Sequence, residues 1–86
     1  MKTEEINKTI SLFMDLKESV INEGYWYSEQ YGYTLPKYDK EWSWLMPAII
    51  KAQVEYKYVT GDETFELQNE SKKLAQFLIA KKNEII

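Results

Sequence analysis

The 86-residue chain contains no cysteine, no histidine and no arginine. Without cysteine and histidine it has no disulfide, no zinc or iron–sulfur ligands of the usual kind, no thiol nucleophile and no imidazole base. All eleven basic residues are lysines, which lack the planar guanidinium that binds phosphate or guanine through two parallel hydrogen bonds. With a net charge of −3, nucleic-acid binding is disfavoured. We therefore expect a protein that is not an enzyme, with no catalytic residues, no metal site and no cofactor.

Long apolar runs are absent too. No stretch approaches the roughly 20 apolar residues of a membrane-spanning helix, and the opening MKTEEINKTISLF has acidic residues where a secretory signal is apolar. The sequence thus predicts a cytoplasmic protein without membrane contact. The chain length and the hydrophobic fraction of 44% predict a single small domain over residues 1–86.

Apolar residues at helical spacing predict a first helix that is capped by Thr3 and ends near Gly24. Its buried stripe is expected to contain Ile6, Ile10, Phe13, Leu16 and Val20, widened by Leu12, Met14 and Ile21. A second helix is predicted from Asp39, a favourable N-cap residue. Pro47 leaves two alternatives for this helix: a kink at Pro47, or a fresh start capped by Ser43.

Residues 54–68 fit two interpretations. In the favoured one, the second helix continues to about Val59, and Asp62 caps a third helix with a buried stripe at Leu67, Ser71, Leu74, Leu78 and Ile85, beside Ala75 and Phe77. In the other, VEYKYV and ETFEL form a hairpin and the last helix begins at Asn69. The expected fold is mainly α, three helices with an irregular aromatic segment between the first two. An α+β fold with a short hairpin or small sheet is the alternative.

Eight of the thirteen aromatic residues lie between Gly24 and Trp44. Trp42 falls on the apolar stripe of the second helix and is expected in the core, whereas Trp44 must face outward or be covered by residues 25–38. A domain of this size cannot bury every tyrosine, and exposed tyrosine and tryptophan are typical of binding surfaces. The predicted partner- or ligand-binding residues are Tyr25, Trp26, Tyr27, Tyr31, Tyr33, Tyr38 and Trp44.

Other polar patterns have simpler explanations. Asp62, Glu66 and Glu70 recur at helical spacing and resemble a paired-carboxylate site, but acidic residues near a helix start are usually solvated. The pairs Lys72-Lys73 and Lys81-Lys82 flank the last helix. A lysine near the C-terminal end of a helix interacts favourably with the helix dipole, which explains Lys81-Lys82. Neither pattern is assigned a site.

The run Tyr38-x-x-x-Trp42-x-Trp44-Leu45-Met46-Pro47 resembles the W-x-W-L-M-P motif of small uncharacterised proteins in Bacteroidetes genomes and their phages, which are similar to the phage ABA sandwich domain group. The opening NKTISLFMDLK and the closing LAQFLIAKKN resemble the two ends of those proteins. In contrast, the stretch between the second and last helices is shorter than their strand-bearing insert. The resemblance implies a phage or prophage origin, hence the cytoplasm of a host cell, and no activity.

Together these features favour a non-enzymatic phage accessory protein that binds and inhibits a host or anti-phage defence protein. One alternative is an oligomeric sponge for a nucleotide second messenger, with lysines such as Lys37 or Lys40 on the phosphates. Another is a structural or assembly protein that needs only self-association. The sequence leaves the partner, the ligand and a homo-oligomeric state open.

Overall fold

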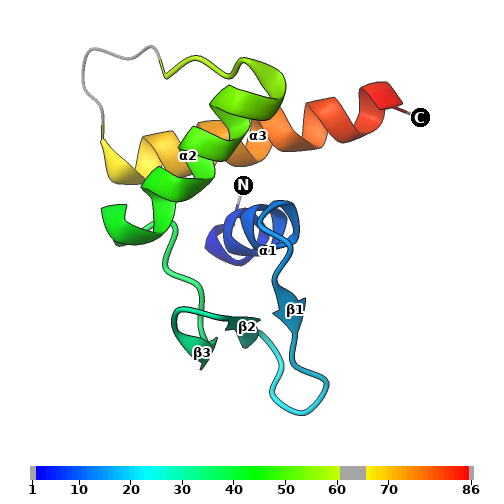
Figure 1. Ribbon diagram of the computed structural model, residues 1–86, viewed down its shortest axis with the longest axis vertical. Helices are drawn as coiled ribbons and strands as arrows, with labels where there is room; N and C mark the ends of the chain where they lie inside the picture. Colours follow the sequence, from blue (N-terminus) through cyan, green and yellow to red (C-terminus); the bar gives the residue numbers. More distant parts are fainter. Residues whose placement is uncertain (1, 61–65, 86) are drawn as a thin grey trace.

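The computed structural model describes residues 2–60 and 66–85. In chain order the elements are α1 (Thr3–Phe13), β1 (Lys17–Glu18), β2 (Trp26–Ser28), β3 (Gly32–Thr34), α2 (Trp42–Tyr56) and α3 (Leu67–Ile85). Figure 1 shows the three helices gathered at one end of the molecule and the strands at the other. The three predicted helices are confirmed, but the sheet makes the fold α+β, so the alternative class describes the chain better than a mainly helical one.

The first helix ends at Phe13, far short of its predicted end near Gly24. Asp15 adopts a left-handed backbone conformation, with φ of +61°, which aspartate tolerates better than most residues. The N–H groups of Asp15 and Leu16 donate to the carbonyl oxygens of Leu12 and Ser11, at 3.1 and 3.0 Å. This pair of hydrogen bonds is the Schellman motif, which closes the C-terminal end of a helix.

The early end overturns part of the predicted buried stripe. Val20 and Ile21 lie beyond the helix and are 99% and 86% exposed, and Leu12 is 53% exposed. Ile6 and Ile10 do lie in the core, with Phe13, Met14 and Leu16 packed partly buried against it. The apolar periodicity therefore predicted the first three turns correctly and failed where the chain leaves the helix.

Lys51 of α2 holds this helix end. Its Nζ donates to the carbonyl oxygen of Phe13 and to Oδ2 of Asp15, the latter at 3.2 Å, and lies 4.6 Å from the centre of the Phe13 ring. A cation at this point neutralises the negative end of the helix dipole and satisfies a free carbonyl. Because the Asp15 side chain is 88% exposed, the ion pair contributes little, and the carbonyl contact is the stronger part.

The strands form one antiparallel sheet in the order β1-β2-β3. In the β2–β3 hairpin, Tyr27 lies opposite Tyr33 and Ser28 opposite Gly32. The turn is closed by Ser28 Oγ, which accepts a hydrogen bond from the N–H of Tyr31 at 3.0 Å, and by Gly32 with φ of +71°. This hairpin matches the α+β alternative and replaces the irregular segment that was expected, whereas β1 falls within the stretch predicted to be helical.

A turn at residues 37–40 connects the hairpin to α2, and Asn7 of α1 holds it. Asn7 Oδ1 accepts a hydrogen bond from the N–H of Tyr38 at 2.9 Å, and its Nδ2 donates to Asp39 Oδ1 at 3.1 Å. Asp39 is therefore not the N-cap of the second helix, which begins at Trp42 after Glu41. The prediction of the cap is wrong because the Asp39 carboxylate bonds to another helix instead.

Pro47 lies in the second turn of α2, inside a continuous helix. It has no N–H to donate, so the carbonyl of Ser43 lacks its usual helical partner, and a fresh start capped by Ser43 is not adopted. The helix ends at Tyr56, short of the predicted end near Val59. Lys57 there adopts a left-handed conformation, with φ of +58°.

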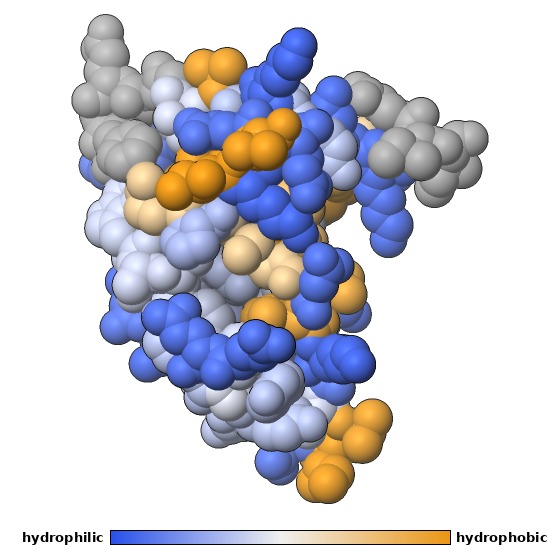
Figure 2. Space-filling model, in the orientation of Figure 1, coloured by the Kyte–Doolittle hydropathy of each residue, from blue (hydrophilic) through white to orange (hydrophobic). Residues whose placement is uncertain are grey.

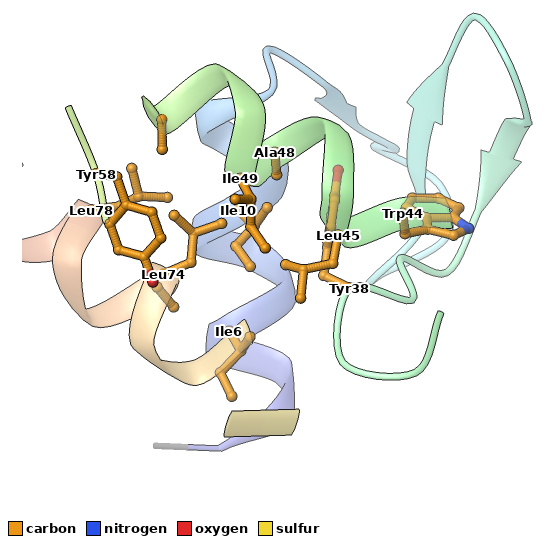
Figure 3. Close-up of a cluster of buried hydrophobic side chains, with 12 residues drawn as sticks. Ile6, Ile10, Tyr38, Trp44, Leu45, Ala48, Ile49, Tyr58, Leu74 and Leu78 are labelled. Carbon is orange, nitrogen blue, oxygen red and sulfur yellow. The ribbon is translucent and has the colours of Figure 1, made fainter. Parts of the chain in front are cut away.

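The core lies where the three helices meet (Figure 3). Its buried residues are Ile6, Ile10, Tyr38, Trp44, Leu45, Ala48, Ile49, Ala52, Tyr58, Leu74, Ala75 and Leu78. The predicted stripe of the third helix is thus confirmed at Leu74, Ala75 and Leu78, and Ser71 is also buried. Of the ambiguous stretch, residues 54–56 are helical and 57–60 belong to neither helix nor strand, while the proposed cap Asp62 lies outside the described residues.

The Lys51 contact gives a test of the helix end. We expect Lys51→Met to lower the free energy of unfolding by about 1–2 kcal/mol, because the Phe13 carbonyl loses its charged donor. Asp15→Asn keeps the left-handed residue but removes the ion pair, and should cost less than about 1 kcal/mol. Urea unfolding followed by circular dichroism measures both. Equal losses in the two variants would assign the stabilisation to the ion pair instead.

Candidate functional site

The outer side of the hairpin carries a pair of tyrosine rings. Because side chains alternate along a strand, Trp26 points inward and is 4% exposed, whereas its neighbour Tyr27 points outward. Tyr33 is the cross-strand partner of Tyr27, and their ring centres lie 5.2 Å apart. Tyr27 is 43% and Tyr33 64% exposed. We call these two residues the tyrosine pair.

Tyr25 and Tyr31 are also exposed, at 37% and 42%, but they differ from the pair in position. Tyr25 precedes β2, and its carbonyl oxygen accepts a hydrogen bond from the N–H of Ser19 at 2.8 Å. Tyr31 lies in the hairpin turn, and its ring stacks on Trp44 with centres 4.6 Å apart and an angle of 11°. One face of the Tyr31 ring is therefore used inside the protein.

Three of the predicted binding residues are buried instead: Trp26, Tyr38 and Trp44. The Tyr38 ring meets Trp44 edge-on, with centres 5.3 Å apart and an angle of 90°. Trp44 is thus held between Tyr31 and Tyr38, at the side of the core nearest the hairpin (Figure 3). Their burial leaves Tyr25, Tyr27, Tyr31 and Tyr33 as the members of the predicted set that a partner reaches.

Of the two tryptophans of α2, Trp44 is the more deeply buried, although Trp42 was the one expected in the core. Trp44 is a member of the buried core, while Trp42 is partly buried and packs against it. The hairpin turn covers Trp44 through Tyr31, which is one of the two positions the sequence left open for this residue. The expected contact of Trp42 with the core is confirmed in part, and Trp44 is buried because Tyr31 and Tyr38 cover it.

The acidic stripe of the third helix does not form a site. Glu70 is fully buried, and neither of its carboxylate oxygens has a hydrogen-bond partner among the described residues. Glu66 is exposed and accepts a hydrogen bond from Asn69 at 3.2 Å, and Asp62 lies outside the described residues. Within the described ranges, no cluster of three or more His, Cys, Asp or Glu residues is suited to hold a metal ion.

The two lysines expected to meet phosphate were Lys37 and Lys40, and both are exposed. Lys40 lines a shallow cleft with Asp39 and Glu66, two carboxylates that oppose an anionic ligand. Lys81 lies 5.5 Å from the centre of the Phe77 ring, a cation–π contact within α3. The described geometry therefore offers little to the nucleotide-sponge alternative, which stays a prediction.

A larger cleft, of about 660 Å³, lies between the N-terminal half of α1 and the sheet. Its charged residues are Glu4, Glu5, Lys8, Glu18 and Glu23, and its apolar lining includes Trp26, Leu35 and Pro36. None of these residues was predicted as a site except Trp26. The sequence did not indicate this cleft because Glu18 and Glu23 were assigned to the first helix, where they would be ordinary solvated residues.

Comparisons with known proteins give no relative. No family profile, curated protein or solved structure matches the chain. None of the described helices combines the length and apolar character needed to cross a bilayer.

The Tyr31–Trp44 stack predicts a spectroscopic change. Tyr31→Ala should uncover one face of the indole, increase acrylamide quenching of tryptophan fluorescence and shift its emission to longer wavelength. The lost ring contact should cost about 0.5–1.5 kcal/mol of stability. Tyr33→Ala is the control, because Tyr33 contacts Tyr27 and not Trp44. Equal quenching in both variants would contradict the covering role of Tyr31.

Because the phenol groups of Tyr38 and Tyr58 are buried, we expect the folded state to lose stability at alkaline pH. Burial raises the pKa of Tyr38 and of Tyr58 to about 12, from 10.0, and the carboxylate of Glu70 adds to the effect at Tyr58. The folded chain thus keeps protons that the unfolded chain releases, so this stability is complete below about pH 10 and lost as the pH rises toward 12. Urea midpoints should fall over that range, and Tyr58→Phe should reduce the slope. A midpoint independent of pH there would contradict the assignment.

Proposed function

We propose that this chain is a non-enzymatic binding protein that contacts a partner protein through the tyrosine pair of its hairpin. The supporting observation is the cross-strand arrangement of Tyr27 and Tyr33, two half-exposed rings 5.2 Å apart on the outer side of an ordered sheet. Tyr25 lies at the edge of the same hairpin and is also exposed.

Tyrosines on a strand pair suit protein recognition for two reasons. Each ring offers a large contact area while losing the freedom of only two side-chain torsions, and its hydroxyl reaches polar groups on the partner. The partner strand fixes the backbone beneath the rings, so little conformational entropy is lost on binding. Such residues recur among the few that provide most of the binding free energy in protein interfaces.

The resemblance to Bacteroidetes phage proteins makes a host or anti-phage defence protein the partner to test first, with inhibition as the consequence of binding. Self-association in an assembly role needs a complementary surface on a second copy of the chain. No described feature of the tyrosine pair favours a second copy over a foreign partner, so the inhibitor role is the one proposed.

The experiment has two stages. A photoreactive phenylalanine analogue at position 33 captures the partner in a lysate of a Bacteroidetes host, and mass spectrometry identifies it. Binding of the purified partner is then measured for the original chain and for Tyr27→Ser with Tyr33→Ser. We expect the double variant to lose about 2 kcal/mol of binding free energy, roughly thirty-fold in Kd, and to restore the activity of the partner.

A matched control removes apolar surface elsewhere. Ile50 and Val54 are 52% and 78% exposed on α2, so Ile50→Ser with Val54→Ser should leave the Kd unchanged. Circular dichroism verifies that both double variants fold. No specific cross-link, or the same Kd for both double variants, would refute the proposal.

A further inference from the structure

The negative charge of the chain is concentrated at the cleft between α1 and the sheet. Four carboxylates and one lysine line it: Glu4, Glu5, Glu18, Glu23 and Lys8. This excess of three carboxylates equals the net charge of the whole chain, so the other residues carry ten acidic and ten basic side chains, which balance. The cleft therefore carries an excess of negative charge that favours a basic ligand.

Only part of this charge has a structural reason. Glu4 and Glu5 lie in the first turn of α1, where the helix dipole favours negative side chains. Glu18 lies on the edge strand β1 and Glu23 in the loop before β2, where no helix end stabilises them. None of the four carboxylates forms an ion pair within the described part of the chain. Lys8 is the one basic residue among those that line the cleft.

Apolar surface lies beside these carboxylates. Leu35, which is 50% exposed, and Pro36 line the cleft, whereas Trp26 behind them is 4% exposed and adds little surface. The loop that carries Glu23 also presents Val20 and Ile21, the two most exposed large apolar residues described. In Figure 2, apolar side chains form the lowest point of the molecule, where Figure 1 draws the β1–β2 loop.

This loop is ordered by its own hydrogen bonds. Ser19 Oγ accepts from the N–H groups of Ile21 and Asn22, at 3.2 and 3.0 Å, and the N–H of Tyr25 donates to the Asn22 carbonyl at 3.2 Å. The exposed β-branched side chains at its tip are thus presented by a defined turn. Ordered apolar side chains in water mark a contact surface.

We propose that this cleft binds a basic segment of a partner protein, in which lysine or arginine residues flank an apolar side chain. The basic residues meet Glu18 and Glu23, and the apolar side chain rests on Leu35 and Pro36. The charge complementarity selects this occupant over a membrane surface, because anionic lipid headgroups repel the carboxylates. The cleft is separate from the tyrosine pair, since Trp26 and Tyr27 point to opposite sides of β2.

The test uses a synthetic probe, a short peptide with two arginines on each side of a leucine, titrated into the isotopically labelled chain. Amide chemical shifts should change around the cleft, and binding should weaken as the salt concentration rises. Glu18→Lys with Glu23→Lys should raise the Kd at least tenfold, and the neutral pair Glu18→Gln with Glu23→Gln should give an intermediate increase.

A control of equal charge is Glu29→Lys with Glu55→Lys, two exposed acidic residues outside the cleft, which should leave the Kd nearly unchanged. A peptide with glutamine in place of arginine should not bind, and Tyr27→Ser with Tyr33→Ser should bind the basic peptide normally. The proposal is overturned by an equal loss in the control pair, by shifts confined to the tyrosine pair, or by no binding at millimolar peptide. A dimer of the chain that closes the cleft, detected by sedimentation, also overturns it in favour of a second copy.

Discussion

The end of α1 in the left-handed turn at Asp15 is the constraint on which the rest of the fold depends. Lys51 supplies a cation to the Phe13 carbonyl and to Asp15, and so holds the left-handed turn that ends the helix. Only because α1 ends there is the following stretch free to form β1 and pair with β2. The Lys51 contact also ties α2 to α1, and Asn7 provides a second tie at residues 38 and 39.

Local sequence patterns predicted the elements whose causes are local. The apolar stripe of α3 has the period of a helix, and the helix forms, although it begins at Leu67 and not directly after Asp62. Residues 26–34 form the short hairpin of the alternative interpretation and not the irregular segment that was favoured. The end of α1 was not predictable in this way. Phe13, Leu16 and Val20 continue the helical spacing, no glycine marks the stop, and the stabilising ammonium comes from a residue 36 positions after Asp15. A tertiary contact overrode the local preference.

The candidate surfaces also differ in whether local sequence patterns predict them or tertiary contacts create them. Exposure of Tyr27 and Tyr33 follows from strand alternation once Trp26 is buried, so a sequence argument reaches it. The burial of Trp44 needs Tyr31 on one face and Tyr38 at its edge, two residues brought together by the hairpin and by the turn that Asn7 holds. The acidic cleft needs both α1 and the loop after β1. When the first helix is predicted to continue to Gly24, Glu18 and Glu23 lie along that helix, and no cleft is expected.

The register in which β2 pairs with β1 and β3 therefore decides which of its side chains are buried and which are exposed. Trp26 faces the interior and Tyr27 the solvent because β2 pairs with β1 and β3 at fixed positions. A slip of one residue would turn Trp26 outward and bury Tyr27, and it would also draw Tyr31 away from Trp44. Such a slip costs the burial of an indole, on the order of several kcal/mol, so the core enforces the outward position of the tyrosine pair. A partner that binds these rings would thus meet a surface that the fold has already arranged.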